Sequence, residues 1–121
     1  MSMHIETRFS DQIERYLDLA VAETKLTAAN MANVDTPGYQ ALGMDFAVEM
    51  RNALAQVDSG GPVRPVRVQV VDGLISRPDG NNVSMDREGL HLAEDQLKFK
   101  TGVALLRLEN QRVMDAIHAD K

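Results

Sequence analysis

The sequence predicts a mainly α protein in which two long helices, one towards each end of the chain, form an antiparallel coiled-coil hairpin. Apolar residues recur at alternating intervals of four and three over residues 8–33 and again over residues 84–119. A short helix and a small irregular or β-hairpin segment are expected between them. Aromatic residues make up only 4% of the chain, so the core is expected to consist of Leu, Val, Ala and Met packed between helices.

The first long helix is predicted over residues 8–33. Small residues occupy much of its apolar seam, so it can approach another helix closely but buries little area. The seam consists of Ile13, Leu17, Ala20, Thr24, Ala28 and Met31. Ser10 or Asp11 is the expected N-cap. Asn33 tolerates the left-handed conformation at a helix end, and Asn30 lies one turn earlier on the same face.

A turn is predicted directly after this helix, within residues 34–44. Pro37 has no backbone N–H and disfavours helix at Thr36. Gly38 accepts the positive φ at the third position, so Thr36-Pro37-Gly38-Tyr39 reads as a type II turn. The Asn30 and Asn33 amides then have two interpretations. One is a helix C-cap with incidental polarity, which we favour, and the other is bonding of both amides to a neighbouring subunit.

A short second helix is predicted over residues 45–56. Asp45 is a suitable N-cap, and apolar residues follow it at intervals of four. They are Phe46, Met50 and Leu54. This helix is expected to end before the glycine-rich run Asp58-Ser59-Gly60-Gly61-Pro62.

Residues 57–83 are predicted to form a loop or a β-hairpin. Valines at 66, 68 and 70 alternate with polar residues, as in a half-exposed strand. Asp72-Gly73 is a turn signal that would lead the chain back through Leu74-Ile75 as the second strand. A second turn cluster, Asp79-Gly80-Asn81-Asn82, closes the segment.

The second long helix is predicted over residues 84–119. Its seam alternates four and three throughout and comprises Leu92, Gln96, Phe99, Val103, Leu106, Asn110, Val113 and Ile117. A second apolar line widens the stripe and comprises Leu90, Leu97, Ala104 and Leu108. Asn110 has two interpretations of equal weight: it fixes the register of a coiled coil, or it remains in water.

Helix length predicts that the chain is part of an assembly. At 1.5 Å per residue the last helix is roughly 50 Å long. A compact domain of this size has a diameter of roughly 35 Å. The first helix can cover one side only of so long a stripe. The remainder is expected to contact other molecules.

Composition excludes several classes of function. The chain has no cysteine, which excludes thiol chemistry, and a net charge of −5, which argues against nucleic-acid binding. Its start lacks the features of a secretory signal peptide. The three histidines, His4, His91 and His118, are far apart in sequence. His91 and Asp95 have the spacing of a helical metal pair, but a third ligand is missing and a solvated face is favoured. No catalytic, metal or cofactor site is predicted.

Three motifs carry a resemblance to a known family. The run from Ala29 to Tyr39, A-N-M-A-N-V-D-T-P-G-Y, closely resembles the A-N-x-A-N-x-x-T-P-G-Y signature of bacterial flagellar rod and hook axial proteins. Residues 44–47 resemble the I-D-F-A segment of the proximal rod members, and residues 79–88 resemble their D-G-N-x-V-D-M-D-R-E entry into the last helix. Ser84 and Phe99 depart from that pattern, where an acidic residue and Tyr are frequent.

The resemblance implies a structural role. Residues 1–121 would form one rod-type domain that assembles helically in the periplasmic rod of the flagellar basal body and transmits torque. Implied partners are copies of itself, other rod proteins, the rod-base adaptor, the MS ring and export gate, and the type III export apparatus, which would export it without a cleaved signal peptide. No nucleic acid, small-molecule substrate or cofactor is implied.

The subunit contacts would come from the signature and from the last helix. The expected interface residues are Asn30, Asn33, Thr36, Pro37, Gly38, Tyr39, Phe99, Val103, Leu106, Asn110, Val113 and Ile117. Two other classes of function stay open beside this one. One is a soluble helical adaptor or chaperone-like binding module, and the other, much less supported, is a small enzyme.

Overall fold

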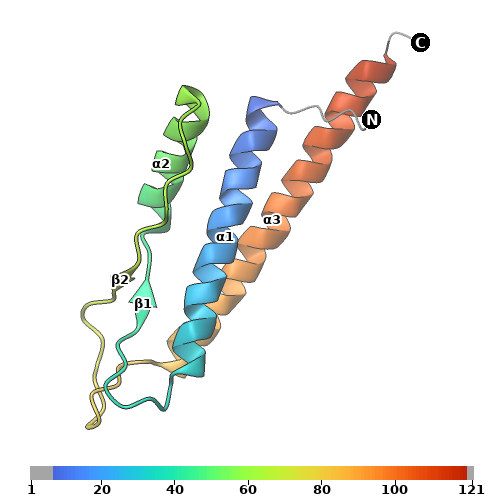
Figure 1. Cartoon of the computed structure of the whole chain (residues 1–121). Coiled ribbons are helices and arrows are strands. Elements are labelled where there is room, and N and C mark those ends of the chain that lie inside the picture. The colour runs from blue at the N-terminus through green and yellow to red at the C-terminus, as the bar shows by residue number, and fades with distance from the viewer. Residues whose placement is uncertain (1–6, 120–121) are drawn as a thin grey trace.

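Two long antiparallel helices and a shorter one beside them make up most of the part of the chain that the structure describes. The computed structural model describes residues 7–119. The elements are α1 (Arg8–Ala32), β1 (Leu42–Gly43), α2 (Phe46–Ser59), β2 (Gln69–Val70) and α3 (Met85–His118). Helix α1 packs against both α2 and α3, and the end of α3 projects past the start of α1 (Figure 1). The predicted mainly α fold with a hairpin of terminal helices is confirmed.

Each helix begins at a side-chain cap. The prediction of Ser10 or Asp11 as the first N-cap is wrong, because Thr7 occupies that position. Thr7 and Ser10 form a reciprocal capping box: the Ser10 N–H donates to Thr7 Oγ1 (3.0 Å) and the Thr7 N–H donates to Ser10 Oγ (2.9 Å). Asp45 caps α2 as predicted, and Ser84 caps α3.

Glycine and asparagine end the first two helices differently. Gly60 ends α2 with φ of 69°, the left-handed conformation that favours glycine. Asn33 follows α1 with φ of −105°, so the left-handed conformation considered for it is not adopted. Helix α2 extends to Ser59, three residues beyond the predicted end at residue 56.

The strand after α2 has a different partner from the one predicted. Val70 pairs antiparallel with Leu42, and Gln69 with Gly43, so the hairpin through Leu74-Ile75 is wrong. Gly43 explains part of this choice. A Cβ there would lie 2.9 Å from Val71 Cγ2, so the close approach of the two segments requires glycine. The Val71 N–H donates to the Ala41 carbonyl (2.9 Å) and extends the pairing.

The core of the described residues is small and partly polar. Six hydrophobic residues are buried, and these are Ile13, Leu19, Ala20, Ala41, Ala53 and Val83. Eight polar or charged residues are also buried, whereas fourteen large hydrophobic residues are exposed. Soluble domains of this size bury most of their large apolar side chains, so residues 7–119 leave an unusual share of apolar surface uncovered.

Candidate functional site: the asparagine cluster and the two faces of α3

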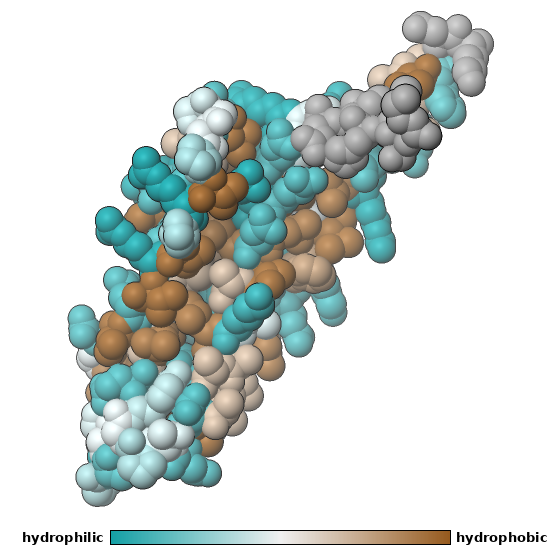
Figure 2. Space-filling view, viewed as in Figure 1, coloured by the Kyte–Doolittle hydropathy of each residue, from teal (hydrophilic) through white to brown (hydrophobic). Residues whose placement is uncertain are grey.

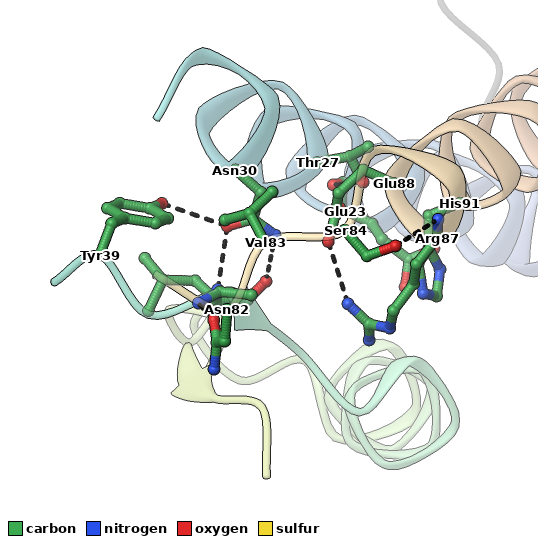
Figure 3. Close-up of polar contacts among 12 residues, drawn as sticks. Glu23, Thr27, Asn30, Tyr39, Asn82, Val83, Ser84, Arg87, Glu88 and His91 are labelled. Carbon is green, nitrogen blue, oxygen red and sulfur yellow. Dashed lines mark hydrogen bonds and ion pairs between the residues drawn. The ribbon is translucent and has the colours of Figure 1, made fainter. Parts of the chain in front are cut away.

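Asn30 holds the chain that follows α1. Its Nδ2 donates to the Leu42 carbonyl (2.8 Å), and its Oδ1 accepts from the Leu42 N–H (2.9 Å) and from the Tyr39 hydroxyl (3.1 Å). Figure 3 shows the Tyr39 ring and the Asn30 amide directed toward one another. Asn30 is 1% exposed and its three hydrogen bonds lie within the chain, so the isolated chain gives no support to bonding of this amide to a neighbouring subunit. The amide instead serves as a backbone partner for β1.

Asn33 and the turn after it form a second, more exposed group. The Asn33 Nδ2 donates to the Ala29 carbonyl (2.8 Å), and Thr36 Oγ1 donates to Asn33 Oδ1 (3.1 Å). The Tyr39 N–H donates to the Thr36 carbonyl (3.2 Å), and Gly38 has φ of 75°. These are the features of the predicted type II turn. Thr36, Pro37 and Gly38 are exposed at its tip.

Asn81 and Asn82 complete the cluster, and their roles were missed in the sequence. The Asn81 Nδ2 donates to the carbonyls of Asn33 (2.9 Å) and Thr36 (2.8 Å), and Asn82 Oδ1 accepts from the Ala41 N–H (2.6 Å). Both asparagines are buried. The feature of the sequence that could have indicated these roles is the pair of consecutive asparagines directly before Val83 and the α3 cap, Ser84. Asn81 and Asn82 therefore join the end of α1, the segment of residues 34–44 that follows it, and the start of α3.

The face of α3 that packs on α1 carries few apolar groups at its centre. The most buried residues of this helix are spaced seven apart, and they are Glu88, Asp95, Gly102 and Glu109. We call these four residues the inner line. It lies one residue before three positions of the predicted seam, namely Gln96, Val103 and Asn110, which corresponds to a rotation of about 100°. The alternation of apolar residues in the sequence located α3 correctly. The buried face that it predicted is rotated by about 100° from the face that is buried in the structure.

Gly102 marks a close approach of the two long helices. A Cβ at this position would lie 2.5 Å from Leu17 Cδ2 and 3.1 Å from Tyr16 Cδ1. A glycine in a helix interior is unfavourable by itself, so a close neighbour is the reason to have one there. Its spacing of seven from Asp95 and from Glu109 was the signal in the sequence.

Two acidic residues meet where the middle of α1 packs on α3. Thr27 Oγ1 donates to Asp95 Oδ2 (3.0 Å), and Lys98 Nζ donates to Glu23 Oε1 (2.7 Å). Burial and then the neighbouring Glu23 raise the pKa of Asp95 to about 7. Burial raises the pKa of Glu23 as well, but hydrogen bonds with Asp95 and Lys98 outweigh it and leave that pKa below its usual value. Lys98 also lies 4.0 Å from the centroid of the Phe46 ring.

Acidic residues also lie at the two ends of the inner line. Glu88 is 2.9 Å from Arg87 Nη1, and Arg112 Nη2 donates to Glu109 Oε1 (2.7 Å). Thr7 Oγ1 donates to the same Glu109 oxygen (2.8 Å) and joins the N-cap of α1 to α3. The hydrogen bonds from Arg112 and then Thr7 lower the pKa of Glu109. Burial, followed by the charge of Glu88, raises the pKa of Tyr39.

The opposite face of α3 is apolar and open. Leu90, Leu97 and Leu108 are 62%, 66% and 67% exposed. Leu90 and Leu97 lie two residues after Glu88 and Asp95, which places them about 200° around the helix from the inner line. We call Leu90, Leu97, Ala104 and Leu108 the outer line. Brown apolar patches lie along the upper half of α3 in Figure 2.

The residues of the predicted seam lie on one flank of α3, beside the inner line. Leu92, Val103, Leu106 and Val113 are partly buried. Phe99, Asn110 and Ile117 are exposed, so Asn110 is in contact with solvent in the isolated chain.

The metal interpretation of His91 and Asp95 receives no support from their positions. His91 Nδ1 lies 3.7 Å from Glu94 Oε2, while Asp95 bonds to Thr27 and is fully buried. The solvated-face alternative is therefore wrong for Asp95. His4 lies outside the described residues. Across residues 7–119, there is no group of three or more possible metal ligands. No helix in that part of the chain has the length and apolar character to cross a membrane.

Comparison with known proteins gives a consistent result. No family model matches the chain. The flagellar basal body rod protein FlgB of Salmonella typhimurium is 34% identical, with 84% of this chain and 86% of the relative covered. FlgB of Cereibacter sphaeroides is 31% identical, with 94% of this chain and 99% of the relative covered. FlgB of Proteus mirabilis is 30% identical, with 91% and 93% covered. The motifs, the terminal-helix hairpin and these identities agree, and the chain belongs to the FlgB family of flagellar basal body rod proteins.

Proposed function

We propose that this chain is a structural subunit of the flagellar rod that assembles helically through α1 and α3. The observation that supports this most directly is the distribution of polarity on α3. Its sheltered inner line consists of three acidic residues and one glycine, while Leu90, Leu97 and Leu108 face outward. A hairpin designed to stay alone would have the opposite arrangement.

Association supplies the burial that the isolated chain lacks. Covering a Leu side chain contributes roughly 1.5–3 kcal/mol, so the three outer-line leucines together offer several kcal/mol to a neighbour. Phe99 and Ile117, which are 45% and 42% exposed, add to the available apolar surface of α3. Copies of this chain and other rod proteins are the proposed partners, and the exposed signature tip at Thr36, Pro37 and Gly38 is a further proposed contact.

The proposed mechanism is mechanical. Helix α3 has 34 residues and is about 50 Å long. Packed helices of this length resist bending and shear together, so a tube of such hairpins transmits torque between the membrane-embedded base and the distal rod. The proposed location is the periplasmic rod of the basal body, after export by the flagellar type III apparatus. Contacts with the rod-base adaptor, the MS ring and the export gate belong to the same proposal.

Replacing Leu97 and Leu108 together with lysine should abolish assembly. Two lysine charges on the outer line cannot be buried in a subunit contact unless opposite charges pair with them. The fold of the hairpin does not depend on these positions, because both side chains are exposed. We expect the double variant to retain the helical circular dichroism spectrum of the parent chain, to be absent from purified basal bodies and to fail to restore swimming in a strain that lacks its own copy.

The matched control is Leu97→Met with Leu108→Met, which keeps the surface apolar and should restore swimming. Recovery of the lysine variant in basal bodies at the level of the parent chain would contradict the proposal. Copurification of the parent chain with basal bodies, and its polymerisation at high concentration, separate a rod subunit from a soluble adaptor.

A further inference from the structure

The contact between Glu23 and Asp95 contains two carboxyl groups but one paired cation, Lys98. Asp95 is 0% exposed, and its Oδ1 has no hydrogen-bond partner among the described residues. Its Oδ2 accepts from the Thr27 hydroxyl, and after burial the neighbouring Glu23 carboxyl group raises the pKa of Asp95 further. A carboxylate cannot donate, so a hydrogen bond between two carboxyl groups requires a proton on one of them.

We propose that Glu23 and Asp95 share one proton between α1 and α3, and that loss of this proton loosens the pairing of the two helices. With the proton present, the pair carries one negative charge, which Lys98 neutralises at 2.7 Å from Glu23. Without it, two carboxylates face one ammonium group in a buried contact. The two negative charges then repel one another and push the helices apart.

The other charged groups near the pair are bonded elsewhere or line the cavities beside it. On α3, His91 acts on Glu23, but His91 itself is paired with the exposed Glu94. Two cavities flank the contact: Lys25 and Lys100 line one beside Asp95, and Asp45, Asp72 and Arg87 line the other beside Glu23. Arg87 is already paired with Glu88. From α2, the Phe46 ring faces Lys98.

The direction of the pH dependence follows from the raised pKa of Asp95. In the unfolded chain an aspartate has a pKa of about 3.9, whereas in the folded chain Asp95 keeps its proton up to about pH 7. The folded state therefore binds more protons in this range, and the stabilisation is lost as pH rises towards 7. The unfolding constant should increase by up to about tenfold per pH unit and level off above. Glu109, whose pKa is lowered, acts in the opposite sense at more acidic pH.

Urea unfolding of the full chain between about pH 5 and 8 tests the proposal. We expect the unfolding constant of the parent chain to rise at least tenfold over this range. Asp95→Asn keeps the shape and can donate to Glu23, so its unfolding constant should be nearly flat and lower than that of the parent at the alkaline end. Glu94→Gln, an exposed acid one position away, should follow the parent. A parent-like slope in Asp95→Asn would overturn the proposal.

Two measurements address the proton and the loosening directly. The carbon-13 shift of the Asp95 carboxyl group should titrate with a midpoint near pH 7, and a midpoint near 4 would overturn the proposal. The chain has no cysteine, so Ala28→Cys with Ala93→Cys gives a clean pair of spin-label sites on exposed positions of α1 and α3. Their distance distribution should broaden on passing above neutral pH in the parent background and stay narrow in Asp95→Asn. An unchanged distribution in the parent would exclude the loosening.

Discussion

Gly102→Ala should lower the free energy of unfolding by about 1–3 kcal/mol, although alanine is the better helix former. The new methyl group would lie 2.5 Å from Leu17 Cδ2 and 3.1 Å from Tyr16 Cδ1, so α1 and α3 must move apart or both side chains must change rotamer. Separation of the helices weakens every contact along the inner line. Urea unfolding monitored by circular dichroism at fixed pH measures the change.

The control for this substitution is present in the same helix. Gly89 is exposed, and a Cβ there meets nothing within 4 Å. Gly89→Ala should therefore stabilise the chain by about 0.5–1 kcal/mol through helix propensity alone. Opposite signs for the two glycine substitutions would establish that backbone proximity at Gly102 outweighs propensity. A stabilising Gly102→Ala would show that the helices in solution lie farther apart than described.

Asn30→Ala should cost about 3 kcal/mol of stability. The substitution removes the partners of both the N–H and the carbonyl of Leu42 and of the Tyr39 hydroxyl. Unpaired buried polar groups cost about 1–3 kcal/mol each, and partial access of water reduces the sum. We also expect faster amide exchange at Leu42 and Gly43, because β1 loses its attachment to α1.

Asn33→Ala provides the comparison for Asn30→Ala. Asn33 is partly exposed and its amide donates to one carbonyl at the end of α1, so a loss of about 1 kcal/mol is expected. Equal losses at the two asparagines would contradict the central role assigned to Asn30. The two substitutions are best compared in the isolated chain, where no neighbouring subunit contributes.

The sequence predicted the helices well because their signals are local. Asp45 and Ser84 precede apolar periodicity and act as caps, and Pro37-Gly38 forms the expected turn. The pairing of β1 with β2, in contrast, depends on contacts between residues that are far apart in the sequence. Val70 pairs with Leu42, some thirty positions earlier, because Asn30 and Asn82 hold the segment around β1 in place. Periodicity of valines cannot reveal a partner that is selected by buried amides.

The buried face of α3 escaped prediction for a different reason. Apolar periodicity assumes that the most hydrophobic line of a helix is the sheltered one. Here Glu88, Asp95 and Glu109 are sheltered by specific partners on α1 or on their own helix, while Leu97 and Leu108 remain open. The assumption fails wherever the most apolar surface of a helix has no partner within the chain. The family resemblance supplied the correct family, because it depends on motifs rather than on which face is covered.

The exposure of Leu90, Leu97 and Leu108 also has a thermal consequence. Contacts made by apolar surface weaken on cooling, whereas hydrogen bonds such as those of Asn30, Asn81 and Asn82 do not depend on that driving force. A filament joined through such leucines should consequently be more sensitive to cold than the individual hairpin. Chilling would then release intact, folded subunits from one another before it unfolds any of them.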